Sequence, residues 1–147
     1  MKISKLKIDP ILESTGREFI FEKDGDKVRV QIARFMNPAH ANKLAEIKES
    51  AEWIHGNDEK RKQLGLKAMF GTVILKIDDL EDDTVDGHTE PWEWNENNFL
   101  DLAKNMPELS NWATEKALNN GNFTMEARRQ LVAKSARGQN GGHSMSS

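Results

Sequence analysis

Residues 17–35 read REFIFEKDGDKVRVQIARF, and this stretch decides how the N-terminal part of the chain folds. The dipeptide Asp24-Gly25 separates two runs: in the second, Val28, Val30 and Ile32 recur at every second position, and in the first, Phe19 and Phe21 do so with Ile20 between them. Such alternation on both sides of an Asp-Gly pair predicts a β-hairpin, here over residues 17–34. One hairpin alone is only marginally stable in water, so we expect it to pack on helices or to pair with a partner.

The segment before the hairpin, KISKLKIDPILES, spaces its apolar residues irregularly. Pro10 disfavours a helical conformation at Asp9. We therefore expect an arm that lays apolar side chains on another surface.

Two helices are expected after the hairpin. Asn37 and Pro38 are suited to the N-cap and the first turn of a helix that ends at Gly56. A second helix begins near Asn57 or Asp58 and carries an apolar stripe that reaches residue 75. Its final run, VILKI at 73–77, is also compatible with a strand, and periodicity does not distinguish the two.

Three further helices are expected in the second half of the chain. Asn95 and Thr124 are suited to N-caps, and Pro107 to a first helical turn. From residue 137 the sequence RGQNGGHSMSS has no apolar pattern and three glycines, which predicts disorder. The predicted fold is mostly α with a small N-terminal β-hairpin (α+β): one compact helical domain over residues 1–136, with a disordered tail at 137–147.

Composition narrows the class of protein. The 147 residues include 37% hydrophobic and 31% charged residues, carry a net charge of −3 and contain no cysteine. Disulfides and thiolate metal sites are therefore excluded. The N-terminus does not resemble a signal peptide, and the longest apolar run, at 68–77, is shorter than the roughly 20 residues that span a membrane. We expect a soluble intracellular protein with no membrane partner.

Motifs that would indicate an enzyme are missing from the sequence. The chain has no Gly-x-Ser-x-Gly, no phosphate-binding glycine loop and no dinucleotide fingerprint. We therefore expect no catalytic residue, no cofactor and no metal site.

The acidic stretch 82–93, DDTVDGHTEPWE, supports an alternative interpretation. Asp82, Thr84, Asp86, Gly87 and Glu93 stand at positions 1, 3, 5, 6 and 12 of a calcium-loop frame. Position 8 lacks the usual aliphatic residue and no second loop is present, so an ordinary solvated acidic loop is the simpler interpretation.

The C-terminal segment supports a second alternative, a small nucleic-acid-binding regulator. Arg128, Arg129, Lys134 and Arg137 make this segment basic. Cations in the last turns of a helix also interact favourably with the helix dipole, and the segment lacks the aromatic residues that stack on single strands. We therefore expect no nucleic-acid partner.

Aromatic residues are the candidates for partner binding. Trp92 and Trp94 are two residues apart, so an extended backbone places both indoles on one surface. Tryptophan is a favoured anchor of protein interfaces. We expect these two, together with Phe99 and Trp53, to contact a partner.

The order of these features resembles the tail assembly chaperones of long-tailed bacteriophages. Three motifs recur in a fixed order in that family. The first is an ARF-x-NP element, here 33–38, and the second is an apolar segment followed by an acidic Asp-Gly turn. The third is a pattern of an aromatic residue, Asn and Leu that leads to Pro-x-Leu, here 92–109. The resemblance covers about residues 3–123. Trp94 departs from it mildly, because many relatives have Tyr or Phe there.

The resemblance implies a function without catalysis. Members bind the tape measure protein, a long helical apolar chain, keep it soluble and recruit the major tail tube protein. They act in the host cytoplasm, are absent from the mature virion, and often exist also in a longer, frameshifted form. The family has no invariant catalytic or ligand-binding residue that could be assigned to a position of this chain. A homo-oligomer is compatible with this function.

Overall fold

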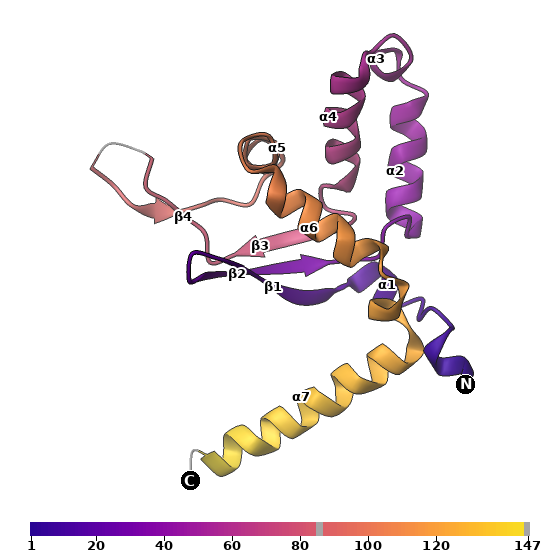
Figure 1. The fold of residues 1–147 in the computed structure, drawn as a ribbon, viewed down its shortest axis with the longest axis vertical. Coiled ribbons are helices and arrows are strands. Elements are labelled where there is room, and N and C mark those ends of the chain that lie inside the picture. The colour runs from indigo at the N-terminus through magenta and orange to yellow at the C-terminus, as the bar shows by residue number, and fades with distance from the viewer. Residues whose placement is uncertain (85–86, 146–147) are drawn as a thin grey trace.

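The computed structural model describes residues 1–84 and 87–145, with side chains as far as residue 136 (Figure 1). It is a mixed α+β fold, as predicted. The helical elements are η1 (Ile3–Lys5), α1 (Leu12–Thr15), α2 (Pro38–Lys48), α3 (Ala51–Ile54), α4 (Asp58–Met69), α5 (Glu96–Asn105), α6 (Pro107–Leu118), η2 (Asn120–Phe123) and α7 (Met125–Met145). The strands are β1 (Arg17–Lys23), β2 (Asp26–Ile32), β3 (Ile74–Asp78), β4 (Glu81–Asp82) and β5 (Glu90–Pro91).

The predicted hairpin is confirmed as β1 and β2, which pair antiparallel from Arg17 opposite Ile32 to Lys23 opposite Asp26. Asp24 and Gly25 connect them with φ angles of 53° and 83°. Two consecutive positive φ values match the right-handed twist of the strands, and Asp-Gly tolerates them at low cost.

The sheet has a third strand, β3, which pairs antiparallel with β2 on the side away from β1. Of the two conformations left open for 73–77, the strand is confirmed, and the continuation of the helical stripe to residue 75 is wrong. α4 ends at Met69, and Gly71 adopts a φ of 74° that reverses the chain. The strand conformation lets Val73, Ile74 and Ile77 bury their side chains against β2.

The single helix expected over residues 38–55 is two helices. α2 ends at Lys48, and Ser50 takes an extended conformation that starts α3. The Ser50 hydroxyl accepts a hydrogen bond from the Trp53 backbone at 3.3 Å, so it acts as an N-cap within the expected helix.

The main core lies between the sheet and the helices. Val30 and Ile32 of β2 are fully buried, and Phe19 and Phe21 of β1 face Trp112 of α6 with ring centroids 6.5 and 5.2 Å apart. The expected helix starts are confirmed for α5, capped by Asn95, for α6 at Pro107, and for α7, capped by Thr124.

A smaller core joins the N-terminal arm to the start of α7. Leu12, Phe123 and Ala127 are buried there, with Ile8 and Leu131 packed against them. The arm therefore does lay apolar side chains on another surface. The sequence predicts a disordered tail over 137–147; the described backbone continues α7 as far as Met145, and residues 146–147 lie outside the described residues.

Asn37 connects three segments that are distant in sequence. Its side-chain amide donates to the carbonyls of Arg34 at 2.8 Å and Thr72 at 2.7 Å, and its oxygen accepts from the His40 backbone at 3.1 Å. The residue is fully buried. The predicted N-cap thus also fixes the end of β2 to the loop between α4 and β3.

We expect Asn37→Ala to lower the free energy of unfolding by about 2–4 kcal/mol, because it removes a cap and the side-chain donor to the Thr72 carbonyl, while the Arg34 carbonyl keeps its bond from the residue 37 backbone. Asn57→Ala is the matched control, since the exposed Asn57 caps α4 through one bond to the Lys60 backbone and should cost only about 1 kcal/mol. Urea unfolding measures both. Equal losses would contradict the bridging role of Asn37.

His40 is buried on the first turn of α2. Its ring lies 4.5 Å from that of Phe35, and its Nδ1 accepts a hydrogen bond of 2.9 Å from the backbone of Met36, a residue with a φ of 64°. Burial lowers the pKa of the imidazole below its ordinary 6.5, and the nearby Lys43 ammonium lowers it further. Protonation at Nδ1 would also remove the acceptor for Met36.

The free energy of unfolding should fall as pH falls below about 6.5, because the unfolded chain then binds a proton that folded His40 resists. Urea midpoints between about pH 7.5 and pH 5 measure this slope. His40→Gln should reduce the dependence of the free energy of unfolding on pH, whatever the stability of the variant at neutral pH. His55→Gln, which replaces an exposed histidine, should leave this dependence unchanged. A slope unchanged by His40→Gln would contradict the assignment.

Candidate functional site: a groove between α4 and α5–α6

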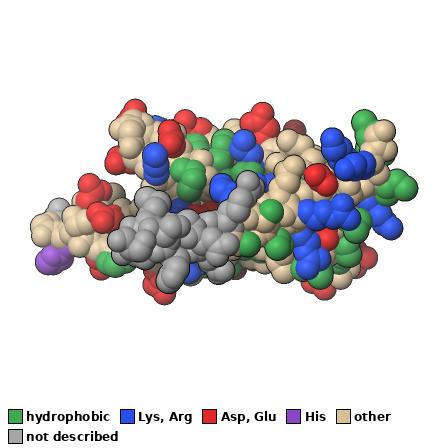
Figure 2. Space-filling model, turned by 90° about the horizontal axis from the view of Figure 1, so that it is seen from below, with side chains coloured by type: hydrophobic (Ala, Val, Ile, Leu, Met, Phe, Trp, Pro, Cys, Tyr) green, Lys and Arg blue, Asp and Glu red, His purple; other side chains and the backbone are tan. Residues whose placement is uncertain are grey.

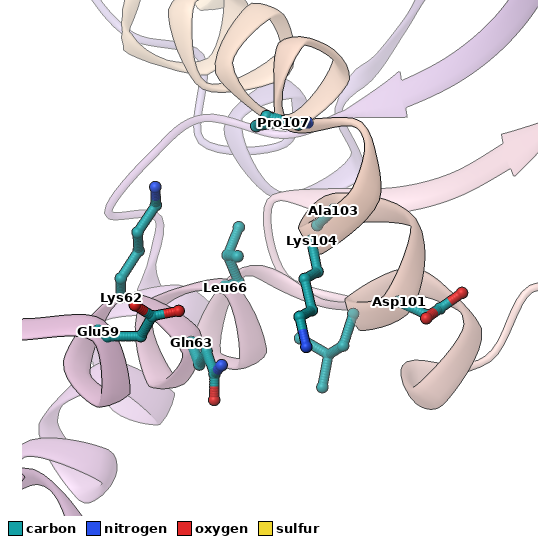
Figure 3. A pocket seen from close by; sticks show the side chains of 9 residues that line it. Glu59, Lys62, Gln63, Leu66, Asp101, Ala103, Lys104 and Pro107 are labelled. Carbon is teal, nitrogen blue, oxygen red and sulfur yellow. The ribbon is translucent and has the colours of Figure 1, made fainter.

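Two adjoining cavities form an open groove between α4 on one side and α5 and α6 on the other (Figure 3). Their volumes are about 410 and 260 Å³. Lys62, Leu66, Ala103 and Pro107 line both, so the cavities are continuous. The second extends toward α2. We call this feature the α4 groove.

The floor of the α4 groove is apolar. Leu66 and Leu100 are half-buried, Ala103 is buried, and the second cavity adds Phe35, Leu44 and Met69. Figure 3 shows Leu66 of α4 opposite Ala103 of α5, with Pro107 at the start of α6. A recess of this kind, open along its length between helices, is suited to the apolar face of an amphipathic helix.

Gly65 opens the wall of the α4 groove. A Cβ atom built on this residue would meet no atom within 4 Å, so the space beside the backbone is free. A glycine in the middle of a helix costs about 1 kcal/mol relative to alanine. In the second cavity the missing side chain allows a ligand to approach the α4 backbone closely.

Charged side chains of both signs form the rim. Glu59 and Lys62 stand on α4, and Asp101 and Lys104 on α5. In the described part of the chain none of these four lies within 4.0 Å of an oppositely charged side chain. They are therefore available for a partner that carries charges beside its apolar stripe.

An aromatic cluster lies one helical turn from the groove floor. Trp94 stacks on Phe70 with centroids 4.7 Å apart and meets the edge of Phe99 at 5.6 Å. Phe70 follows Leu66 by four residues, and Phe99 precedes Ala103 by four, so the cluster adjoins one end of the α4 groove.

Lys43 of α2 holds the aromatic cluster in position. Its ammonium donates to the Phe70 carbonyl at 2.8 Å and lies 5.6 Å from the Phe70 ring centroid. Burial lowers the pKa of Lys43, although Glu96 opposes that effect. The cation thus ties α2 to the end of α4.

The structure brings three of the four predicted partner-binding residues together. Trp92 and Trp94 are half-buried neighbours, with ring centroids 6.2 Å apart. Phe99 is only 2% exposed, so the expectation that its ring contacts a partner directly is corrected: it supports Trp94 from the core. Trp53 lies apart on α3, between the cations of Lys48 and Arg61.

The acidic stretch forms a two-stranded ribbon of β4 and β5, with Asp82 opposite Glu90. Calcium loops of the proposed kind are flanked by helices instead. The Asp82 carboxylate accepts hydrogen bonds from the backbone and hydroxyl of Thr84, and these bonds lower its pKa. Asp86, the expected third ligand, lies outside the described residues.

The basic segment is partly neutralised. Arg128 pairs with Asp9 at 3.2 Å, and Arg129 approaches Glu126 at 3.9 Å. Lys134 is exposed, and the side chain of Arg137 lies outside the described residues. Two of the four cations named for nucleic-acid binding therefore already have carboxylate partners.

The sequence predicts the helix that is α4 in the structure, but it does not identify the groove. Gly65 was the available signal, because a helical glycine permits close approach of another backbone. Leu66, Leu100 and Ala103 gave no such signal. They become one surface only when α4 and α5 are packed side by side.

Comparison of the chain with protein-family models, with curated proteins and with solved structures finds no match in any of the three. Within residues 1–84 and 87–145, no helix is long and apolar enough to cross a membrane. Among the side chains that the structure describes, in residues 1–84 and 87–136, no group of three or more His, Asp or Glu is arranged to hold a metal ion.

We expect Trp94→Phe to lower the free energy of unfolding by less than about 1.5 kcal/mol, because a phenyl ring can still stack on Phe70 and Phe99. Trp94→Ala should cost about 2–4 kcal/mol, since it leaves a cavity between those rings. Chemical denaturation measures both. A similar loss in the two variants would mean that the indole makes a contact other than stacking.

Proposed function

We propose that this chain is a tail assembly chaperone of a long-tailed bacteriophage, and that the α4 groove holds an apolar helical segment of the tape measure protein. The observation that carries the proposal is the groove itself: an apolar floor, open between helices, with charges of both signs along the rim. The ordered motifs over residues 3–123 support the same assignment.

The size of the groove limits what one copy can cover. Its walls, α4 and α5, have 12 and 10 residues, which corresponds to about 15–18 Å of helix. One copy would therefore cover about three turns of a client helix. A long apolar client would therefore need many copies along its length.

In this proposal, one part of the protein surface provides solubility and another part binds the client. Charged residues make up 31% of the chain, and such a surface resists aggregation. The apolar side chains available to a client are recessed between helices and bordered by Glu59, Lys62, Asp101 and Lys104. The protein would act in the host cytoplasm, recruit tail tube subunits to the coated client and leave before the tail is complete.

Gly65→Phe tests the groove, because its Cβ enters open space and its ring adds bulk to the recess that Gly65 lines. Gly65→Ala is the matched control: it shares the gain in helix propensity of about 1 kcal/mol but leaves most of the volume free. Co-expression with the tape measure protein of the same phage gene cluster, followed by measurement of the soluble client fraction, compares them.

We expect the unchanged chain and Gly65→Ala to keep the client soluble and Gly65→Phe to lose most of this effect. Full activity of a well-folded Gly65→Phe variant would place the client elsewhere on the protein. Failure of the unchanged chain to solubilise or co-purify with the client would contradict the chaperone proposal as a whole.

A further inference from the structure

A second surface lies away from the α4 groove, at the end of the molecule that carries the N-terminus. It consists of η1, the arm around it and the first three turns of α7, and we call it the α7 surface. Met125 of α7 donates its backbone N–H to the Lys7 carbonyl at 2.9 Å, and Ser4 donates to the Glu126 carboxylate at 3.4 Å, so the arm and helix form one unit.

The α7 surface exposes large aliphatic side chains. Ile3 is 74% exposed, Leu6 67% and Val132 62%. A shallow cavity of about 400 Å³ runs along the helix beside Asp9. Its α7 residues are Met125, Arg128, Arg129, Val132, Ala133 and Ala136.

These residues follow the spacing of one helix face. The spacing is four, three and four residues along Met125, Arg129, Val132 and Ala136. This is the pattern of a helix that packs along a second helix. Ala133 and Ala136 are small, so a partner backbone can come close. In this structure α7 packs on η1 and η2 at its start and otherwise extends away from the body (Figure 1).

The charge around this face is positive, although the whole chain is acidic. Residues 1–11 and 125–136 contain six lysines and arginines and two carboxylates, Asp9 and Glu126, each of which already contacts an arginine. Figure 2 shows Lys and Arg side chains interleaved with hydrophobic ones at this end of the molecule. An apolar stripe with cationic borders matches a partner with an apolar stripe and carboxylate borders.

We propose that the α7 surface docks an acidic amphipathic α-helix from another protein, independently of the α4 groove. A second copy of this chain fits poorly, because Glu126 is the only carboxylate in residues 125–136 and two such faces would oppose cation to cation. Single-stranded nucleic acid fits poorly as well, because the exposed apolar groups are aliphatic and offer no ring for stacking.

The test uses a labelled synthetic peptide of about 20 residues, with leucines at intervals of three and four and glutamates beside them. Binding to the full chain is followed by fluorescence anisotropy at about 50 and 300 mM salt. We expect saturable binding that weakens with salt, and no binding of the same peptide with lysine in place of glutamate.

Variants locate the bound peptide. Val132→Asp and Arg129→Glu change exposed side chains on the face and should each weaken binding about tenfold or more. Gln130→Asp is the matched control, since it adds a negative charge on another face of α7 and should have little effect. Gly65→Phe should leave peptide binding intact, which separates this surface from the proposed client groove.

Three results would overturn the proposal. The first is absence of binding by the acidic peptide, or capture only of anionic lipid vesicles or a single-stranded oligonucleotide. The second is binding that Val132→Asp and Arg129→Glu leave unchanged in folded protein. The third is loss of peptide binding in Gly65→Phe, because the peptide would then occupy the α4 groove.

Discussion

The buried amide of Asn37 is the contact on which the arrangement of sheet and helices depends. It satisfies the Arg34 and Thr72 carbonyls and the His40 backbone N–H at the point where β2, α2 and the loop after α4 meet. Because that loop leads into β3, the same side chain fixes α4 relative to the sheet. One wall of the α4 groove is therefore positioned by a residue outside the groove.

The helices around the groove share the main core, to which α4, α5 and α6 contribute Met69, Phe99 and Leu109, and contacts at their ends hold them as well. Lys43 donates to the carbonyl of Phe70, the residue that follows α4, and Trp94 stacks on the Phe70 ring from the segment that leads into α5. Gly65 and Leu66, in the middle of α4, line the recess. A preformed recess of this kind reduces the conformational entropy that is lost when a partner binds.

The molecule separates two kinds of apolar surface. The α4 groove is recessed and bordered by charges of both signs, whereas the α7 surface is more open and bordered by cations. This difference in charge predicts different partners, because like charges opposed across an interface disfavour binding. A protein that brings a helical client together with another component needs two such surfaces that do not compete.

The sequence by itself determined the features that neighbouring residues control: the Asp24-Gly25 hairpin, the caps at Asn37, Asn95 and Thr124, and the helix start at Pro107. Each needs only one turn or a few hydrogen bonds. Only the tertiary structure decided that 74–78 is a strand, that Ser50 divides a helix, that Phe99 supports Trp94 from the core, and that Leu66 and Ala103 share a groove. Those outcomes depend on which surfaces remain to be covered once distant segments pack together, and local periodicity does not contain that information.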